Sequence, residues 1–581
     1  MKLIDYYEDE IRYFLEEARR FSRRYPDRAK ALNLEEVKER DPYVERLIEA
    51  FAFLSGNINK RLNDDFSQLA QELIETLWPH YLSPLPGAVI LQLSPIAGRL
   101  KKSVELAPGV WADSVPVSME QSCRFTTTSG VAVKPLVISH AAMVGRRDGR
   151  SALRIGFNHL KGSRWADVGE GEVSIYLHGD PGFAFSLYYM LLQDTEGILV
   201  RYGKGEEGIE IPLGRDRIRS LRFNGVEDSP LIPGRELAFP GFRLLEEYFF
   251  FPEKFRFVDV DFLDVIGAAA DGMEVQVDFL LSGRMDWRLN PDASAFRLHC
   301  VPAVNMYPKG AEPIYLDDAI PTHKIVADQG HPDHHVPHHI LRVEGIRLED
   351  SQRCLYPSFL SYGHESENGM EDSYYHFTRQ VGVDGVPEMH LGIHRPIGVG
   401  AEIISVDLMC SNGDKVREVK LGDVKHPGDT VPDFVSITNV TTPKAPVWPN
   451  IEGRELWTLV HHLSLNYLSL DDPDRLRSLI SFYDREKSRA NQRRTEGIVS
   501  VSIVPSEILF KGYPLRGIDM DMVLDERHFT GQGDVLMFSH VISRMMSMYV
   551  PINSFCNLSV RELNTENIYT WPGIKGMQAV L

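Results

Sequence analysis

The feature that most constrains the fold is a change in the spacing of apolar residues near residue 88. Before this point, apolar side chains recur at three- and four-residue steps, which is the period of an amphipathic helix. After it, apolar and polar residues alternate over short runs, which is the period of a half-buried strand. The pattern therefore predicts a helical start followed by a long strand-rich region.

The first eighty residues are predicted to form at least two helices. Tyr25-Pro26 ends or interrupts the first, because proline disfavours helical backbone in the residue before it. Asp41 and Pro42 suit the cap and the first position of the second. Apolar side chains line the first helix at Tyr7, Ile11, Phe14, Leu15, Ala18 and Phe21. They line the second at Val44, Leu47, Ile48, Phe51, Leu54, Ile58 and Leu62, and then at Phe66, Leu69, Leu73 and Leu77 until Pro79.

The middle of the chain is predicted to form several sheets. Val89-Ile90-Leu91-Gln92-Leu93 is the first predicted strand, and short apolar runs separated by turn residues continue for some three hundred positions. The segments Phe185–Leu192 and Leu244–Phe249 interrupt them as predicted helices. Further strands are predicted at Ala152–Phe157, Val173–Leu177, Ile198–Tyr202, Phe255–Val260 and Val275–Leu281.

The last third is predicted to mix both kinds of element and to close with a tail rich in proline and asparagine. Helices are predicted at Glu455–Leu470, Leu476–Phe482 and Leu536–Met548, and strands at Ile498–Val504 and Ile518–Leu524. We therefore expect a multi-lobed α+β fold. We expect a helical region over 1–84, β-rich lobes over 85–390 and a mixed α+β region over 391–581.

Composition narrows the class of protein. The net charge of −19 repels duplex nucleic acid, and no long basic run offsets it. The five cysteines are widely spaced, which indicates reduced, buried thiols in a cytosolic protein. The start of the chain has no apolar signal core, and the absence of about 18 uninterrupted apolar residues predicts no transmembrane helix.

A cluster of histidines offers the strongest alternative function. The tract His331-Pro332-Asp333-His334-His335, with His323, His338 and His339 around it, contains residues that can ligate zinc. A metal-dependent hydrolase that uses the segment 323–339 is therefore one hypothesis. However, the HExxH pattern is absent, and the prolines favour a mobile surface loop. The pair His461-His462 cannot chelate one ion from a helix, because adjacent side chains point about 100° apart.

Two other motifs match catalytic patterns only in letters. Gly203-Lys204-Gly205-Glu206-Glu207-Gly208 fits the dinucleotide-binding pattern, but a strand-like segment follows it where that site needs a helix. We predict a turn between two strands. Asp519-Met520-Asp521 lies in the alternating run from Ile518 to Leu524, which predicts a strand with a polar outer face.

Aromatic residues gather in two segments. Five aromatics occupy eight positions from Tyr248 to Phe255, and Trp571 follows a C-terminal segment rich in isoleucine, phenylalanine and tyrosine. Core packing is the preferred interpretation, because large apolar side chains are usually buried. Protein interfaces are the alternative, because aromatic residues are also enriched there. Aromatic side chains alone also fit a carbohydrate-binding β-sandwich.

Several segments together resemble the TssF family (also called VasA or ImpG), baseplate subunits of the bacterial type VI secretion system. The resemblance runs in order from Tyr6 to the tail. The matching segments are Tyr6–Tyr13, Phe21–Pro26, Asp41–Leu54, Leu77–Leu82 with Pro84 and Pro86, Arg243–Phe255, Ala311–Asp317, His462–Leu470 and Tyr549–Phe555. The histidine tract matches no family motif, and Cys410-Ser411-Asn412-Gly413-Asp414 only approximates one.

The resemblance implies a structural role without catalysis, metal or cofactor. Such proteins pair with TssG, typically two copies to one, as a wedge that joins TssK and TssE around a VgrG hub. The assembled baseplate is expected in the bacterial cytoplasm, docked at the inner-membrane complex, and resembles contractile phage baseplates. We expect contacts to TssG or to the second TssF copy at Tyr7, Phe14, Phe51, Leu54, Ile58, Tyr248, Phe250, Tyr549, Ile552, Phe555 and Trp571.

Overall fold

The computed structural model describes most of the chain, and by its internal contacts the chain divides into two units. The first contains Met1–Leu82, Phe377–Glu388 and Asn450–Ser464, and the second contains the rest. The described residues are 3–24, 46–58, 74, 81–117, 121–203, 208–220, 230–232, 240–267, 270–283, 289–316, 320–359, 373–382, 387–396, 400–449, 470–510, 513–550 and 554–575.

In the first unit, helix α1 (Leu3–Arg24) packs against a helix over 46–58. A small residue permits this close contact, because a Cβ on Gly56 would stand 3.2 Å from the backbone nitrogen of Tyr7. The rings of Tyr7 and Phe53 meet edge to face with centroids 6.4 Å apart. The Ser55 hydroxyl also donates a hydrogen bond to Glu10 across the helix pair, at 2.9 Å. The first predicted helix and the part of the second over 46–58 are confirmed. The predicted break at Tyr25-Pro26, the cap at Asp41 and Pro42, and the later positions Leu62, Phe66, Leu69, Leu73 and Leu77 lie outside the described residues.

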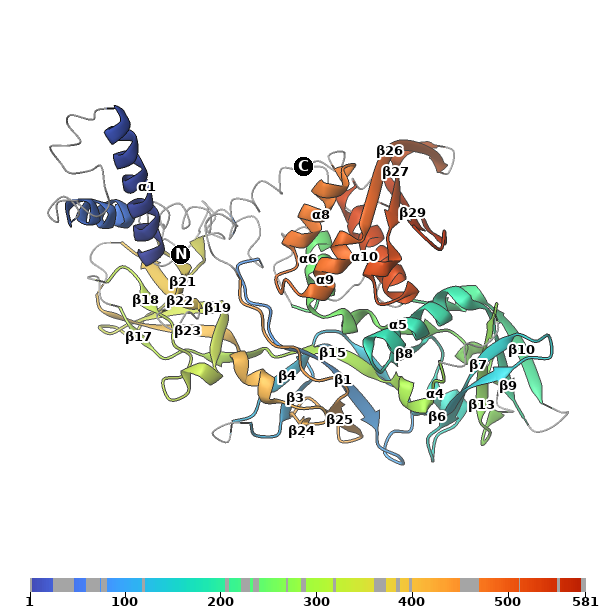
Figure 1. The fold of residues 1–581 in the computed structure, drawn as a ribbon. Helices are drawn as coiled ribbons and strands as arrows, with labels where there is room; N and C mark the ends of the chain where they lie inside the picture. The colour runs from blue at the N-terminus through green and yellow to red at the C-terminus, as the bar shows by residue number, and fades with distance from the viewer. Residues whose placement is uncertain are drawn as a thin grey trace. The chain divides into compact units, whose positions relative to one another are not determined.

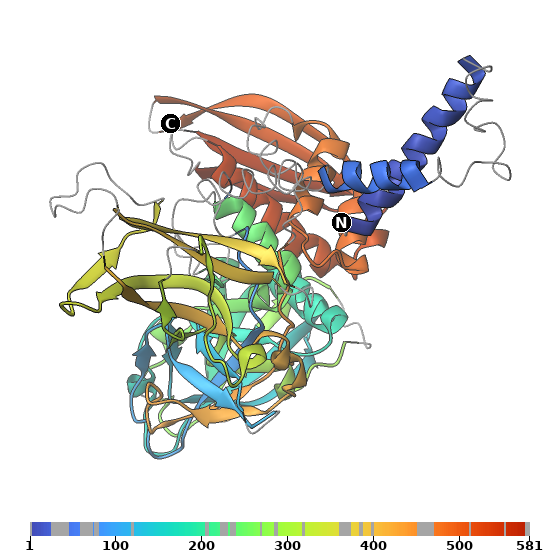
Figure 2. The same cartoon turned by 90° about the vertical axis from the view of Figure 1, so that its left-hand side faces the viewer.

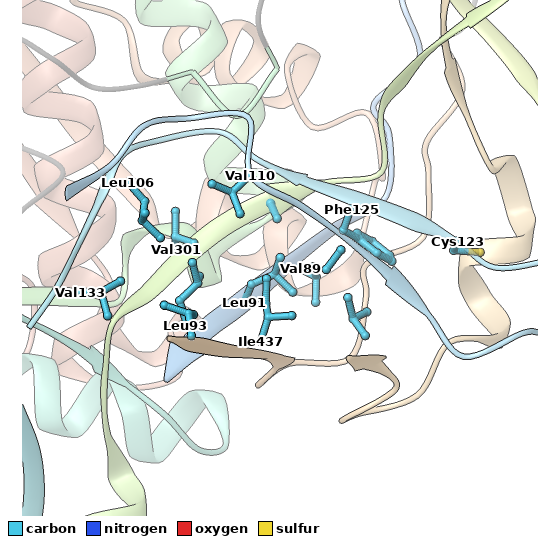
Figure 3. Close-up of a cluster of buried hydrophobic side chains, with 14 of the residues drawn as sticks. Val89, Leu91, Leu93, Leu106, Val110, Cys123, Phe125, Val133, Val301 and Ile437 are labelled. Atoms are coloured by element: carbon cyan, nitrogen blue, oxygen red, sulfur yellow. The ribbon is translucent and has the colours of Figure 1, made fainter. Parts of the chain in front are cut away.

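A six-stranded sheet of the second unit, here called the inner sheet, has the order β24-β3-β4-β15-β1-β25. Its strands come from distant parts of the chain, since β1 pairs antiparallel with both β15 and β25. Figure 3 shows Val89, Leu91, Leu93, Val301 and Ile437 converging on one buried cluster. The strand bounds are Ala88–Pro95 (β1), Trp111–Ser114 (β3), Arg124–Thr127 (β4), Cys300–Val304 (β15), Val424–Pro427 (β24) and Val435–Asn439 (β25).

Two further antiparallel sheets contain the strands between β5 and β15. One has the order β10-β9-β13-β7-β6, and the other has the order β11-β12-β8-β14. A short pair, β2 (Val104–Leu106) with β5 (Val131–Val133), accompanies them. The bounds are Leu136–Gly145 (β6), Ser151–His159 (β7), Val173–Leu177 (β8), Thr195–Tyr202 (β9), Ile209–Gly214 (β10), Ile218–Arg219 (β11), Phe257–Val260 (β12), Val275–Leu281 (β13) and Phe296–Leu298 (β14).

The chain then leaves the inner sheet to build a separate sheet, here called the outer lobe. It has the order β16-β23-β19-β20, and β17 also pairs with β23. Its bounds are Tyr307–Gly310 (β16), Ile314–Tyr315 (β17), Val336–Arg347 (β19), Arg353–Tyr356 (β20) and Glu402–Ser411 (β23). A three-stranded sheet contains β18 (His323–Lys324), β22 (Pro387–His394) and β21 (Tyr374–Val381). The yellow and olive strands of Figure 2 belong to these sheets.

The C-terminal sheet has the order β26-β27-β28-β29 and packs against helix α10 (Gln532–Tyr549). Figure 1 shows this sheet in red beside α10. Helices α5 (Pro181–Tyr189) and α6 (Pro240–Phe250) also contact α10. The remaining bounds are Trp165–Val168 (α4), Pro473–Phe482 (α8), Arg489–Glu496 (α9), Ile498–Phe510 (β26), Tyr513–Leu524 (β27), Phe555–Glu562 (β28) and Ile568–Lys575 (β29).

The expected α+β class with a β-rich middle is confirmed. The predicted strands, the two helical insertions and the helices at α8 and α10 are confirmed as well. The sequence analysis assigned no element to the C-terminal tail, where β28 and β29 complete the C-terminal sheet. The prediction for Glu455–Leu470 falls almost entirely outside the described residues. Within the described residues, no helix is long and apolar enough to span a bilayer.

Candidate interaction surfaces

The helix over 46–58 exposes an apolar stripe to solvent. Leu47, Phe51, Leu54 and Ile58 each leave between 52% and 56% of their surface exposed. They follow one another at four-, three- and four-residue steps, which is the spacing of a coiled-coil seam. On the same helix, Ala52 is fully buried, so the helix has one packed face and one open apolar face.

The two candidate residues on α1 lie partly covered. Tyr7 contacts Phe53 as described above and is half-buried. Phe14 is also half-buried, and its ring centroid lies 5.9 Å from that of Tyr13, which is itself well exposed. Tyr7 therefore contributes to the contact between the two helices, and among the described residues of this unit the four side chains of the stripe are more exposed than Tyr7 and Phe14.

The aromatic segment from Tyr248 to Phe255 lies in the interior, so the preferred interpretation, core packing, is what the structure shows. Tyr248 and Phe250 are both buried. The Tyr248 hydroxyl donates to Asp534 on α10 at 3.4 Å, and its ring packs against Phe538 at 6.1 Å. The expectation that Tyr248 and Phe250 contact a partner is therefore corrected, because contacts within the chain bury both side chains.

Three buried ion pairs surround this segment. Glu247 pairs with Lys254. Glu246 pairs with Arg485, and Arg494 bonds Asp534 at 2.9 Å. Burial raises the pKa of Glu246 to about 7, and Arg485 opposes this rise. The motif Arg243–Phe255, which contributes to the family resemblance, also contacts both neighbouring helices, because Asn491 on α9 donates to the Phe249 carbonyl and Tyr248 donates to Asp534 on α10.

The C-terminal candidates have different environments. Phe555 is buried in β28, so its expected partner contact is also corrected. Trp571 in β29 is half-buried, and its ring centroid lies 5.1 Å from that of His540 on α10. Ile552 and the side chain of Tyr549 lie outside the described part of the chain.

The histidine tract is ordered structure, and the expectation of a mobile surface loop is wrong. A short 3-10 turn (Pro332–His334) leads directly into β19. His334 Nε2 donates to the carbonyl oxygen of Ser122 at 3.1 Å, and His338 Nε2 donates to that of Pro84 at 2.7 Å. Both side chains are buried.

His335 and His339 also have protein partners. His335 Nδ1 lies 2.7 Å from the Tyr307 hydroxyl, and burial lowers the pKa of His335 to about 4. His339 Nδ1 lies 3.0 Å from Nδ1 of His338. Among the described residues, no group of three or more His, Cys, Asp or Glu side chains is arranged to hold a metal ion. This arrangement does not favour the hypothesis of a metal-dependent hydrolase. The pair His461-His462 lies outside the described residues.

The strands that flank the glycine motif are described, whereas residues 204–207 of the motif lie outside the described residues. β9 and β10 pair antiparallel from Tyr202 and Ile209, as the prediction of two strands requires. Asp519 and Asp521 lie on β27 and alternate with Ile518, Met520 and Met522, whose side chains are buried. Asp519 accepts a hydrogen bond from Asn557 on β28 at 2.7 Å.

Two exposed apolar surfaces were missed by the sequence analysis. On the outer lobe, Tyr315 is 62% exposed and Leu355 is 58% exposed. On the C-terminal sheet, the hairpin of β26 and β27 extends beyond β28, whose pairing with β27 begins only at Ile518. Leu509 near its end is 81% exposed. The alternation of apolar and polar residues along β26 indicates that the strand has two different faces. It does not show that no other element packs against the apolar face near the end of the hairpin.

Comparisons with known proteins identify the family and the fold of the chain. A family model described as "Type VI secretion system, TssF" matches residues 1–578. The Pseudomonas aeruginosa protein "Type VI secretion system component TssF1" is 27% identical over 627 aligned residues, which cover 99% of each chain.

Two solved structures have the same fold. A chain of the TssK-TssF-TssG baseplate subcomplex of the type VI secretion system, determined by cryo-electron microscopy, superposes with a TM-score of 0.76 and 26% identity. That match covers 92% of this chain and 99% of the other. A chain of the baseplate complex from the type VI secretion system matches over 100% of both chains, with a TM-score of 0.67 and 24% identity, and it supports the fold alone.

Proposed function

This chain belongs to the TssF family of the type VI secretion system, and from this premise we propose that it assembles as a wedge subunit of the baseplate. The family consists of structural baseplate components, so the chain has a structural role and is not an enzyme. In the proposed wedge, two copies of this chain associate with one TssG. The wedges then join TssK and TssE around a VgrG hub, in the cytoplasm at the inner-membrane complex.

The exposed stripe of Leu47, Phe51, Leu54 and Ile58 is the observation that carries the proposal. Fully burying a large apolar side chain contributes about 1.5–3 kcal/mol, so covering the exposed half of one contributes about 1 kcal/mol. Four such side chains contribute about 4 kcal/mol, which corresponds to roughly a thousandfold in affinity. A surface of this kind stabilises an assembly when a partner covers it.

The spacing of the stripe indicates the kind of partner. Side chains at alternating four- and three-residue steps pack into the holes of a second helix that has the same spacing. We therefore infer that a helix of TssG, or the same helix of the second copy, covers the stripe. Tyr7 and Phe14 on α1, both half-buried, and Trp571 remain separate candidate contacts.

The test is co-expression of TssG with a tagged Phe51→Asp/Leu54→Asp variant. Both side chains are exposed, so the variant should fold while placing two charges in the proposed interface. We expect co-purification of TssG to be lost. A matched control is Tyr315→Asp/Leu355→Asp, which changes two equally exposed apolar residues on the outer lobe and should leave co-purification intact. Full recovery of TssG with the Phe51→Asp/Leu54→Asp variant contradicts the assignment of the stripe.

A further inference from the structure

The outer lobe is connected to the inner sheet by two short crossings of the chain. The first runs from β15 to β16 and contains Asn305 and Met306. The second runs from β23 to a 3-10 helix (Gly413–Glu418) and contains Asn412. These two crossings are the covalent links about which the lobe can turn, and Met409 on β23 also packs against the buried cluster that contains Ala88 and Ile90 of β1.

An asparagine lies at each crossing, and the two side chains bind each other. The backbone N–H of Asn412 donates to Oδ1 of Asn305 at 2.6 Å. Nδ2 of Asn305 donates to Oδ1 of Asn412, also at 2.6 Å. Asn305 is 0% exposed and Asn412 is 1% exposed, so no water competes for these bonds.

The same pair connects the lobe to the inner sheet. On the inner sheet, Asn412 Oδ1 accepts from the backbone N–H of Arg124 at 3.0 Å, and Asn305 Nδ2 donates to the Arg124 carbonyl at 2.7 Å. On the lobe, Asn412 Nδ2 donates to the Tyr307 hydroxyl at 3.1 Å and to the His334 carbonyl at 3.0 Å. Both amide groups therefore use each of their N–H donors, which makes the network satisfied and specific in geometry.

Two histidines reinforce the joint from the lobe side. His334 bonds the carbonyl of Ser122, just before β4, and His338 bonds that of Pro84, just before β1. Each is a single hydrogen bond from a buried ring to a backbone carbonyl of the inner region. The histidine tract thus holds the lobe against the inner region at two places, the Ser122 and Pro84 carbonyls.

We propose that Asn305 and Asn412 form a lock that holds the outer lobe at one angle to the inner sheet, with His334 and His338 as secondary latches. Without the lock, the lobe rotates about residues 305–306 and 411–412 while both sheets stay folded. The exposed Tyr315 on β17 and Leu355 on β20 belong to this lobe, so the lock also determines where these two side chains lie.

The lock can be tested by spin labelling of the full-length chain. Cys123, Cys300, Cys410 and Cys556 are buried, so replacing Cys354 by serine leaves no accessible thiol among the cysteines. Leu355→Cys on the lobe and Lys425→Cys on β24 then supply two exposed labelling sites. Electron paramagnetic resonance gives the distribution of distances between the two labels.

The expected result is one narrow distribution for the otherwise unchanged protein and a distribution broadened by roughly twofold, or split, in Asn412→Ala. The matched control is Asn439→Ala, which removes a buried asparagine that bonds Val424, Lys420 and Thr441 away from the joint. This control should lose stability but keep a narrow distribution. A narrow distribution in folded Asn412→Ala, or equal broadening in the control, overturns the proposal.

If Asn412→Ala does not fold, the His334→Ala/His338→Ala variant tests the same joint with the asparagines intact. The expected result is broadening intermediate between the unchanged protein and a free hinge. Protection of the β19 and β23 amides from hydrogen exchange should stay unchanged, because the lobe itself remains folded. A distribution as narrow as that of the unchanged protein, or loss of protection in β19 and β23, overturns the proposal.

Discussion

Gly533, near the start of α10, lies directly against the backbone of Phe185 in α5. A Cβ on Gly533 would stand 1.9 Å from the Phe185 carbonyl oxygen, which is far inside van der Waals contact. The obstacle is backbone in another helix, so it cannot move aside as a flexible side chain does. The absence of a side chain at residue 533 therefore permits the packing of α10 on α5.

Gly533→Ala should destabilise the protein by about 3 kcal/mol or more, because overpacking a rigid contact forces the two helices apart. Chemical denaturation followed by circular dichroism measures this loss. Gly182→Ala in α5 is the control, since a Cβ there meets only the Thr530 methyl at 3.5 Å. Equal stability of the two variants contradicts the close contact.

Lys254→Met should destabilise the protein by about 3–5 kcal/mol, because it leaves the buried carboxylate of Glu247 without its main partner. The double variant Lys254→Met/Glu247→Gln should recover part of this loss, because it removes the unpaired charge as well. A double-mutant cycle measures the coupling between the two residues. Strictly additive losses show that the two side chains do not interact, contrary to the structure.

Stability should fall as the pH drops from about 6.5 towards 4. Burial lowers the pKa of His299, His335 and His540 to about 4, so the unfolded chain binds more protons than the folded chain in this window. Above about pH 6.5 these histidines are neutral in both the folded and the unfolded chain, so they cost no stability. As the pH falls from 6.5 towards the folded pKa of about 4, the unfolded chain takes up protons first and the free energy of unfolding decreases. The raised pKa of Glu246 acts in the opposite direction between about pH 7 and 4.5.

Comparison with a His540→Gln variant isolates one of these contributions. Glutamine does not titrate, and its amide can still bond the Tyr188 hydroxyl, which His540 Nδ1 contacts at 3.2 Å. We expect the denaturation midpoint of the variant to fall less than that of the unchanged protein between pH 6.5 and 4.5. Parallel pH profiles show that His540 is not held neutral by burial.

The local period of the sequence was sufficient for most individual elements but not for their arrangement. Val89 and Leu91 alternate clearly enough to predict a strand. Nothing near them indicates that β1 pairs with both Val301 on β15 and Ile437 on β25. Such pairings depend on contacts hundreds of residues apart, and a single sequence does not record them.

The same limit explains the outcomes at the candidate sites. The spacing of apolar residues predicted the stripe that includes Phe51. The same spacing occurs in a helix face that is buried within its own chain and in one that is exposed to solvent, so it does not distinguish the two. Residue type suggested metal chemistry for His334 and His338, whereas their actual partners are carbonyls of Ser122 and Pro84. Those carbonyls are 212 and 254 residues away, so composition could not reveal them.

The composition of the complex captured from the native host through a tag on the full-length chain tests the baseplate assignment most directly. Mass spectrometry with absolute quantification gives the partners and their ratio. The account predicts a TssG-like protein at about half the molar amount of this chain, with TssK and TssE alongside. Recovery of the chain alone, or with partners unrelated to the baseplate, would contradict the account.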